Sequence, residues 1–197
     1  MAATILTRRA MVVGSLGLLA GCADGGPEGE SPTPEADNPA IGGVTQQGSL
    51  SLSSPAFDPG GEIPAEYGHS SRNVNPPLRI AGVPPETAAL TLVMDDPDAV
   101  EPAGTVWLHW LVWNIPPSTA AIPADWDASG AVEGTNDFGE TGYGGPDPPD
   151  RVHTYRFKLF AIETELDLPN TADKRAVGRA MIDRIVGRTQ LTGTFAP

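Results

Sequence analysis

The chain has 197 residues, a length that suits one domain with an appendage and is too short for two full domains and a linker. Its 23 glycines and 21 prolines exclude a helical bundle or a coiled coil and favour a loop-rich β protein. The 25 acidic residues against 12 basic ones give a net charge of −13 without any basic cluster, which excludes a groove built to neutralise nucleic-acid phosphates. The single cysteine excludes an intramolecular disulfide and any metal site that needs a cysteine pair.

The N-terminal residues have the pattern of an export signal. An arginine pair, Arg8 and Arg9, precedes an apolar stretch over 10–21, which is too short to span a membrane and has the length of a signal-peptide core. The stretch ends in Leu19-Ala20-Gly21-Cys22, the pattern of a bacterial lipobox. We therefore predict a lipoprotein signal peptide over 1–21 and a lipidated Cys22, which would anchor the exported protein on the extracytoplasmic side of the cell membrane.

The export route stays open, because the arginine pair fits both a twin-arginine signal and a general secretory signal. An ordinary signal peptide with a chance cysteine, or an uncleaved anchor, is the alternative to the lipoprotein. Residues 23–47 contain five acids, no base and no aromatic residue, so they bury too little apolar surface to fold. Together with Cys22 they predict a disordered tether over 22–47, followed by a folded domain over 48–197.

Strand periodicity dominates the folded part. Alternating polar and apolar residues predict strands over 88–95 and 153–162, and the segment 106–115, apolar on both faces, predicts a central strand. Between turns rich in glycine and proline, shorter strand candidates lie at 50–57, 77–81 and 191–195.

One helix is expected near the C-terminus, over 172–186. Asn170 or Thr171 would cap its start, and Gly187 follows its end. The predicted fold class is therefore mainly β, with one or two helices packed at an edge.

Three ionisable residues lie in register with apolar strand faces: Asp96 with Met94, His109 with Trp107 and Leu111, and His153 with Tyr155. Each taken alone also fits a turn or a satisfied core position. Because buried polar groups need partners, we expect the three to meet in a polar-floored pocket, walled by Trp107, Trp110 or Phe138. The glycine-rich loop 134–150 is expected to line this pocket, whereas His69 is expected at the surface.

Four motifs occur in a characteristic order. They are Asn75-Pro76-Pro77-Leu78, then Asp96-Pro97-Asp98-Ala99, then Trp107-Leu108-His109-Trp110 leading to Asn114-Ile115-Pro116, and finally Gly145-Pro146-Asp147-Pro148-Pro149 followed by His153-Thr154-Tyr155. With these motifs the sequence resembles the phosphatidylethanolamine-binding protein family, also called Raf kinase inhibitor-like proteins, in its bacterial branch. The resemblance covers about residues 50–196.

The resemblance implies an antiparallel β-sandwich with Greek-key connections and a small anion pocket. Carried over motif by motif, the implied ligand-binding residues are Asp96, His109, His153 and Tyr155, with Asp98 in support, Trp107 as a wall and the Gly145 N–H as an anion donor. Asp96 would fix a histidine tautomer or receive an ammonium group. The chain departs from the family pattern at Asp147, which adds a negative charge to the pocket lip. No catalytic residue, metal or cofactor is implied.

The expected function is that of a membrane-tethered binding or regulatory protein, not an enzyme. Its ligand would be a small anion or a phospholipid headgroup of the phosphate or phosphoethanolamine type. One alternative is an inhibitor of an envelope peptidase or of another envelope protein. The other is a metal-dependent enzyme, because two histidines and one aspartate resemble a facial triad.

Overall fold

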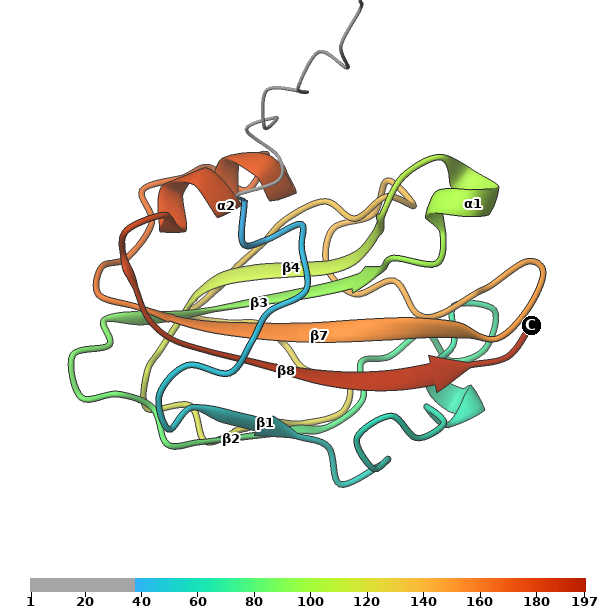
Figure 1. Ribbon diagram of the computed structural model, residues 1–197, viewed down its shortest axis with the longest axis horizontal. Coiled ribbons are helices and arrows are strands. Elements are labelled where there is room, and N and C mark those ends of the chain that lie inside the picture. Colours follow the sequence, from blue (N-terminus) through green and yellow to red (C-terminus); the bar gives the residue numbers. More distant parts are fainter. Residues whose placement is uncertain (1–37) are drawn as a thin grey trace, which may run out of the picture. The chain divides into compact units, whose positions relative to one another are not determined.

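The computed structural model describes residues 38–197, and these residues form two packed antiparallel sheets with a helix on the outer side (Figure 1). The predicted signal peptide 1–21, the predicted lipidated Cys22 and the predicted tether as far as residue 37 lie outside the described residues. The larger sheet has the strand order β6-β4-β3-β7-β8, and the smaller one has the order β1-β2-β5. The strands are β1 (Ser51–Ser53), β2 (Leu78–Ala81), β3 (Ala89–Asp96), β4 (Trp107–Ile115), β5 (Ala121–Ile122), β6 (Val132–Glu133), β7 (His153–Ile162) and β8 (Ile185–Phe195). The helices are η1 (Ala65–Tyr67), α1 (Val100–Ala103) and α2 (Lys174–Met181).

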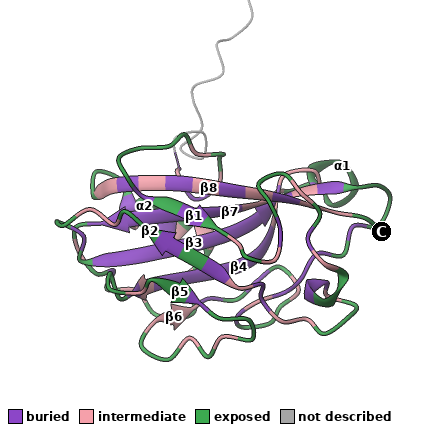
Figure 2. Ribbon diagram, turned by 90° about the horizontal axis from the view of Figure 1, so that it is seen from below, coloured by how far each residue is buried: buried purple, intermediate pink, exposed green. Residues whose placement is uncertain are grey.

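The three long central strands follow the predicted segments closely. All eight residues of β3 are buried, and β4 is buried along most of its length (Figure 2). Prolines at 97 and 116 follow the ends of β3 and β4, where a missing N–H cannot continue a ladder. After β4 the chain visits the smaller sheet through β5 and returns so that β7 pairs with β3 on the side away from β4. This long return is what a Greek-key connection requires, and the fold is mainly β as expected.

Each face of the larger sheet has its own apolar core. The inner face packs against β1 and β2 and includes Leu92, Met94 and Phe157. The outer face packs against α2 and includes Val93 and Phe160. Because strand residues alternate between faces, the sequence pattern of β3 and β7 determined which side chains enter which core.

The folded unit begins before residue 48, so the predicted tether boundary is wrong for residues 38–47. In Figure 1 this segment, drawn in blue, crosses the larger sheet. Ala40 is buried, and its carbonyl and that of Gly42 accept hydrogen bonds from Lys158 Nζ at 2.5 and 3.1 Å. Lys158 also donates to Asp95 Oδ2 at 2.6 Å. A buried ammonium needs such acceptors. The segment 38–47 therefore packs on the outer face of the sheet, although its composition alone predicts disorder.

The predicted helix 172–186 is too long at both ends. Asp173, not Asn170 or Thr171, caps α2 by accepting a hydrogen bond from the Ala176 N–H at 2.6 Å. The helix ends at Met181, and β8 begins at Ile185, which pairs with Ile162. Pairing along the length of β7 therefore outweighs the helical periodicity of residues 182–186, and Gly187 lies within a strand. None of the helices in residues 38–197 is long and apolar enough to cross a membrane.

Candidate functional site

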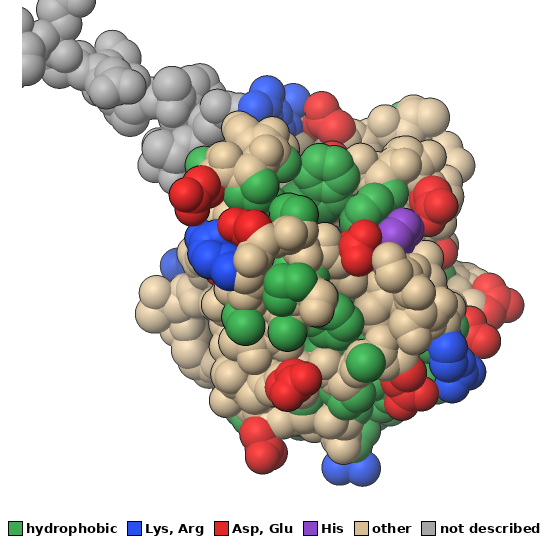
Figure 3. Space-filling view, turned by 90° about the vertical axis from the view of Figure 1, so that its right-hand side faces the viewer, with side chains coloured by type: hydrophobic (Ala, Val, Ile, Leu, Met, Phe, Trp, Pro, Cys, Tyr) green, Lys and Arg blue, Asp and Glu red, His purple; other side chains and the backbone are tan. Residues whose placement is uncertain are grey.

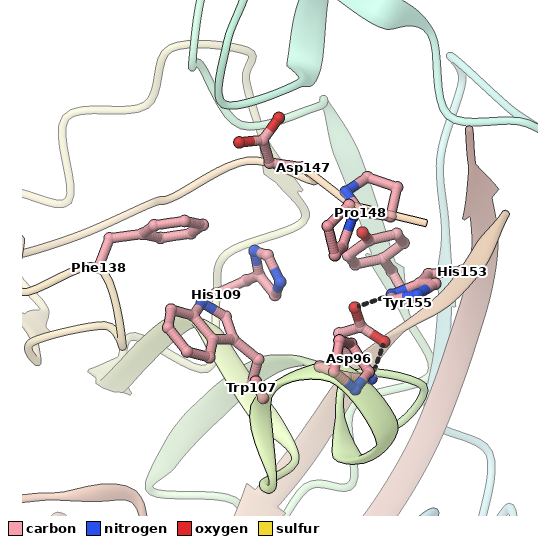
Figure 4. Close-up of a pocket in the computed structure, with 12 residues that line it drawn as sticks. Asp96, Trp107, His109, Phe138, Asp147, Pro148, His153 and Tyr155 are labelled. Carbon is pink, nitrogen blue, oxygen red and sulfur yellow. Dashed lines mark hydrogen bonds and ion pairs between the residues drawn. The ribbon is translucent and has the colours of Figure 1, made fainter. Parts of the chain in front are cut away.

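A cavity of about 220 Å³ opens at the end of the larger sheet where β3 ends and β7 begins. In Figure 4 Trp107 and Phe138 lie on one side of the open space and Tyr155 and His153 on the other. Five of the predicted site residues line it, whereas Asp98 and Gly145 do not. The lining residues are Asp96, Ala99, Pro102, Ala103, Trp107, His109, Phe138, Asp147, Pro148, Pro149, His153 and Tyr155.

A β-bulge in β4 turns His109 into this cavity. Met94 pairs with Trp110, but the next residue of β3, Asp95, pairs with Leu108, so His109 is the extra residue. The prediction that His109 shares a face with Leu111 is therefore wrong, because Leu111 packs in the outer core. The ring of His109 instead meets Tyr155 of the inner face edge-on, with centroids 5.1 Å apart.

Asp96 and His153 form a buried hydrogen-bonded pair on the floor of the pocket. The Nδ1–H of His153 donates to Asp96 Oδ2 at 2.6 Å, and its Nε2 contacts Asp150 Oδ1 at 2.9 Å. The other oxygen of Asp96 accepts the backbone N–H groups of Asp98 and Ala99. Burial lowers the pKa of His153, but the hydrogen bonds and charges of Asp96 and Asp150 outweigh burial and raise it above its ordinary value. Both ring nitrogens of His153 are therefore committed to carboxylates.

His109 is held from its other side by backbone carbonyls. Its Nδ1 lies 2.8 Å from Gly144 O and 3.1 Å from Gly145 O, so Nδ1 carries the proton. Burial lowers the pKa of His109, although these carbonyls and the charge of Asp96 partly oppose the shift. The imidazole is therefore neutral at pH 7, and Nε2 is a hydrogen-bond acceptor.

The backbone of Gly145 does not serve as the expected anion donor. Its N–H donates to Asn73 Oδ1 at 2.8 Å. A side chain at position 145 would place Cβ 2.3 Å from the Tyr67 carbonyl oxygen, so close packing of two loops accounts for the glycine.

Two buried polar groups at the pocket make no hydrogen bond of normal geometry within residues 38–197. These are the hydroxyl of Tyr155 and the indole N–H of Trp107. Burial, followed by the charge of Asp96, raises the pKa of Tyr155, so the phenol stays protonated. Because an unsatisfied buried polar group is costly, both are positions at which a ligand would be stabilised.

Aromatic rings form one wall of the pocket. Phe138 contacts Trp107 edge-on at 5.4 Å and stacks on His69 at 4.0 Å with an angle of 6° between the rings. His69 therefore supports the wall and is only partly exposed, contrary to the expected surface position. Of the proposed wall residues, Trp110 is the one that lies elsewhere, because it packs against Tyr143 and donates to Glu133.

The remaining predicted residues act around the pocket. Asp98 accepts the Thr154 N–H at 2.8 Å, which fixes the start of β7 beside His153. Within the loop 134–150, Phe138, Asp147 and Pro148 line the cavity, in agreement with the expected place of this loop. Asp150 was missed, and its spacing of three residues before His153 was the signal that could have indicated it. No group of three or more His, Cys, Asp or Glu in residues 38–197 is placed to hold a metal ion.

Comparison with known proteins gives matches over the same part of the chain. A family model described as phosphatidylethanolamine-binding protein matches residues 53–196. A UPF0098 protein of Methanothermobacter thermautotrophicus is 41% identical over 151 residues, which cover 74% of this chain and 98% of the relative. A UPF0098 protein of Aquifex aeolicus is 37% identical over 153 residues, covering 74% of this chain and 88% of that protein.

Two solved structures have the same fold. A putative phosphatidylethanolamine-binding protein homologue from Chlamydia trachomatis has a TM-score of 0.70 and 34% identity, covering 75% of this chain and 97% of that one. YbcL of E. coli, described as a new member of the mammalian PEBP family, has a TM-score of 0.69 and 30% identity, covering 75% and 98%. Since the family model covers the whole larger sheet and every residue that lines the pocket, the chain belongs to the phosphatidylethanolamine-binding protein family.

Proposed function

We propose that this protein is an exported, lipid-anchored binding protein whose pocket takes a small headgroup of the phosphoethanolamine type, and that it is not an enzyme. Membership of the family supports a binding role. The volume of the cavity, about 220 Å³, supports a ligand no larger than a headgroup. The lipobox at Cys22 supports the anchor.

The observation that carries this proposal is the hydroxyl of Tyr155, which makes no hydrogen bond of normal geometry although Asp96 and the Asp147 backbone lie close to it. It lies at the cavity, its side chain is fully buried, and it can donate or accept a hydrogen bond. Two of the anion donors implied by the family resemblance are already used within the fold, because the Gly145 N–H and both nitrogens of His153 have internal partners. The ligand that we propose therefore carries both donor and acceptor groups, as a zwitterion does.

Replacing Tyr155 by phenylalanine is expected to weaken phosphoethanolamine binding about tenfold, because one hydrogen bond to a charged ligand is lost. The free energy of unfolding should stay within about 0.5 kcal/mol, since the hydroxyl makes no hydrogen bond of normal geometry within the fold. Calorimetric titration and a melting curve measure the two effects.

Tyr143→Phe is the matched control. The Tyr143 hydroxyl donates to the Tyr67 carbonyl at 2.9 Å and does not line the pocket. This variant should lose about 1 kcal/mol of stability and keep its affinity. Unchanged affinity in Tyr155→Phe, or equal losses in both variants, would contradict the proposed site.

The anchor is tested by Cys22→Ser, which is expected to move the protein from the membrane fraction to the soluble fraction, because serine cannot accept a thioether-linked lipid. Fractionation of cells and the mass of the purified chain check this. Ser31→Ala is a control outside the arginine pair and the lipobox, and it should remain lipidated. A Cys22→Ser variant that still sediments with membranes at the wild-type mass would show that the lipoprotein assignment is wrong.

A further inference from the structure

Basic side chains gather around α2, although residues 38–197 contain twenty acidic residues and ten basic ones. The helix carries Lys174, Arg175 and Arg179, and Arg184 follows in the turn after it. These residues form no continuous run in the sequence, but they place four of the ten basic residues on one short helix and its following turn. At the end of the molecule that carries α1 and the C-terminus, by contrast, acidic side chains are spread over the face and basic ones lie near its outline (Figure 3).

The outward face of α2 combines positive charge with an exposed apolar side chain. Arg175, Arg179 and Ile182 are spaced by four and three positions, so they follow one another along one face of the helix. The opposite face is buried, since Val177 and Met181 pack in the outer core. Ile182, which ends the helix, is nevertheless 39% exposed. Arginines around an exposed aliphatic side chain are typical of a surface that contacts a membrane interface.

Two arginines of this surface have no acidic partner. Arg179 and Arg184 are exposed, and neither side chain makes a hydrogen bond or an ion pair within residues 38–197. Asp183 is the one acidic residue within 174–184, so this stretch keeps a net positive charge. Its charge is therefore available to an anionic partner.

The N-terminal part of the chain joins the domain at this same helix. The side chain of Asn38 donates from Nδ2 to the Arg175 carbonyl at 3.0 Å. A Cβ at Gly178 would lie 1.7 Å from Asn38 Oδ1, so the helix has a glycine where Asn38 packs. The sixteen residues 22–37 can span at most about 55 Å. With Cys22 lipidated, the anchoring chain therefore leaves the domain beside α2.

We propose that the α2 surface, formed by Arg175, Arg179, Ile182 and Arg184, docks on an anionic phospholipid bilayer. The arginines contact the headgroup phosphates, and Ile182 enters the interface between headgroups and acyl chains. This inference rests on the lipid anchor of the proposed function, which keeps the bilayer within reach. An anchor alone leaves the domain free to rotate, whereas docking of α2 fixes one orientation. The pocket stays accessible in this orientation, because none of its lining residues belongs to the α2 surface.

A nitroxide label on Ile182→Cys tests the docking, because the label replaces one apolar side chain by another. The full chain, as the cell processes it, is reconstituted with phosphatidylcholine vesicles that contain or lack phosphatidylglycerol. Relaxation by an aqueous nickel complex and by oxygen, which dissolves in lipid, reports whether the label lies in water or in the bilayer.

Ser53→Cys carries the control label. Ser53 is exposed on β1, whose sheet packs on the inner face of the larger sheet, whereas α2 packs on the outer face. We expect the label at position 182 to lose its contact with the nickel complex only in vesicles that contain phosphatidylglycerol. The label at position 53 should stay in water in both kinds of vesicle. Equal shielding of the two labels would overturn the inference, because it would show no preference for α2.

Flotation of the vesicles separates the docking from the lipid anchor. Protein that floats with both kinds of vesicle while the label at position 182 stays in water would overturn the docking and leave the anchor standing. Protein that floats only with phosphatidylglycerol and shields this label would support the docking and contradict the anchor. Protein that floats with neither would overturn both. Equal shielding of this label in the two kinds of vesicle would also overturn the docking, because another part of the chain, such as the acidic residues 23–37, would then cover α2.

A charge-matched pair of double variants tests the arginines. Arg179→Gln combined with Arg184→Gln is expected to weaken docking about thirtyfold, since each arginine at an anionic surface contributes about fivefold. Arg72→Gln combined with Arg79→Gln makes the same change of charge in a loop and on the exposed side of β2, and it should leave the label at position 182 shielded. Equal losses in the two double variants would overturn the assigned surface, because total charge would then determine docking.

Discussion

Lys158→Met is expected to lower the free energy of unfolding by about 3–5 kcal/mol, the largest effect of any substitution considered for this chain. Both Lys158 and its partner Asp95 are fully buried on the outer face of the larger sheet. Methionine keeps the volume but leaves Asp95 with Arg156 as its remaining cationic partner, at 2.7 Å. It also leaves the carbonyls of Ala40 and Gly42 without their donor. Burial lowers the pKa of Lys158 to about 8 although Asp95 opposes the shift, so the ammonium form is present at pH 7.

Denaturant unfolding at pH 7 measures this loss, and Lys174→Met is its matched control. Lys174 makes one hydrogen bond, to the Val106 carbonyl at 2.8 Å, so its replacement should cost about 1 kcal/mol. Proteolysis should in addition become faster within residues 38–47 of Lys158→Met only, because that segment loses its anchor. Similar losses for both lysines would mean that the segment 38–47 contributes nothing specific to the fold.

Asp96→Asn is expected to lower the free energy of unfolding by about 2 kcal/mol at pH 6, because it turns a charge-assisted hydrogen bond to His153 into a neutral one. Asparagine keeps an oxygen for the N–H groups of Asp98 and Ala99 and so preserves the turn. Melting curves at several pH values measure the effect.

The pH dependence follows from the raised pKa of His153. A base whose pKa is higher in the folded state than its ordinary value of 6.5 stabilises the fold fully below pH 6.5, and this contribution is lost as the pH rises through the folded pKa. The wild-type protein should therefore lose stability on going upward from pH 6.5. Asp96→Asn should flatten this dependence, since only Asp150 then favours the protonated ring.

Asp98→Asn serves as the control for the loss of one carboxylate at this end of the sheet. Asp98 is about a third exposed, and its contact with Arg151 is long, at 3.7 Å, so the variant should lose less than about 1 kcal/mol. It should also keep the wild-type pH dependence. If the NMR titration of His153 gives the same pKa in wild type and Asp96→Asn, the buried pair does not set the charge of the ring.

The sequence by itself determined the β class, the positions of β3, β4 and β7, and the family, because these depend on local information. Alternation in β7 fixed which side chains face inward, and it placed His153 and Tyr155 on one face at the same pocket. The register of Asp96 and His153 with apolar strand faces was sufficient to predict that the two residues meet. In the structure His153 Nδ1 and Asp96 Oδ2 form a hydrogen bond of 2.6 Å.

Only the tertiary structure decided which hydrogen bonds the pocket residues make and which way they point, since both depend on residues far away in the chain. The bulge that turns His109 inward exists because β3 and β4 pair out of register there, and periodicity within β4 cannot report that. The Gly145 N–H is not free to bind an anion, because it donates to Asn73, which lies 72 residues earlier. The segment 38–47 packs on the sheet because its carbonyls accept hydrogen bonds from the buried Lys158, which lies more than 100 residues later in the sequence. Local composition sets what a segment can do alone, whereas burial against distant residues sets what it does.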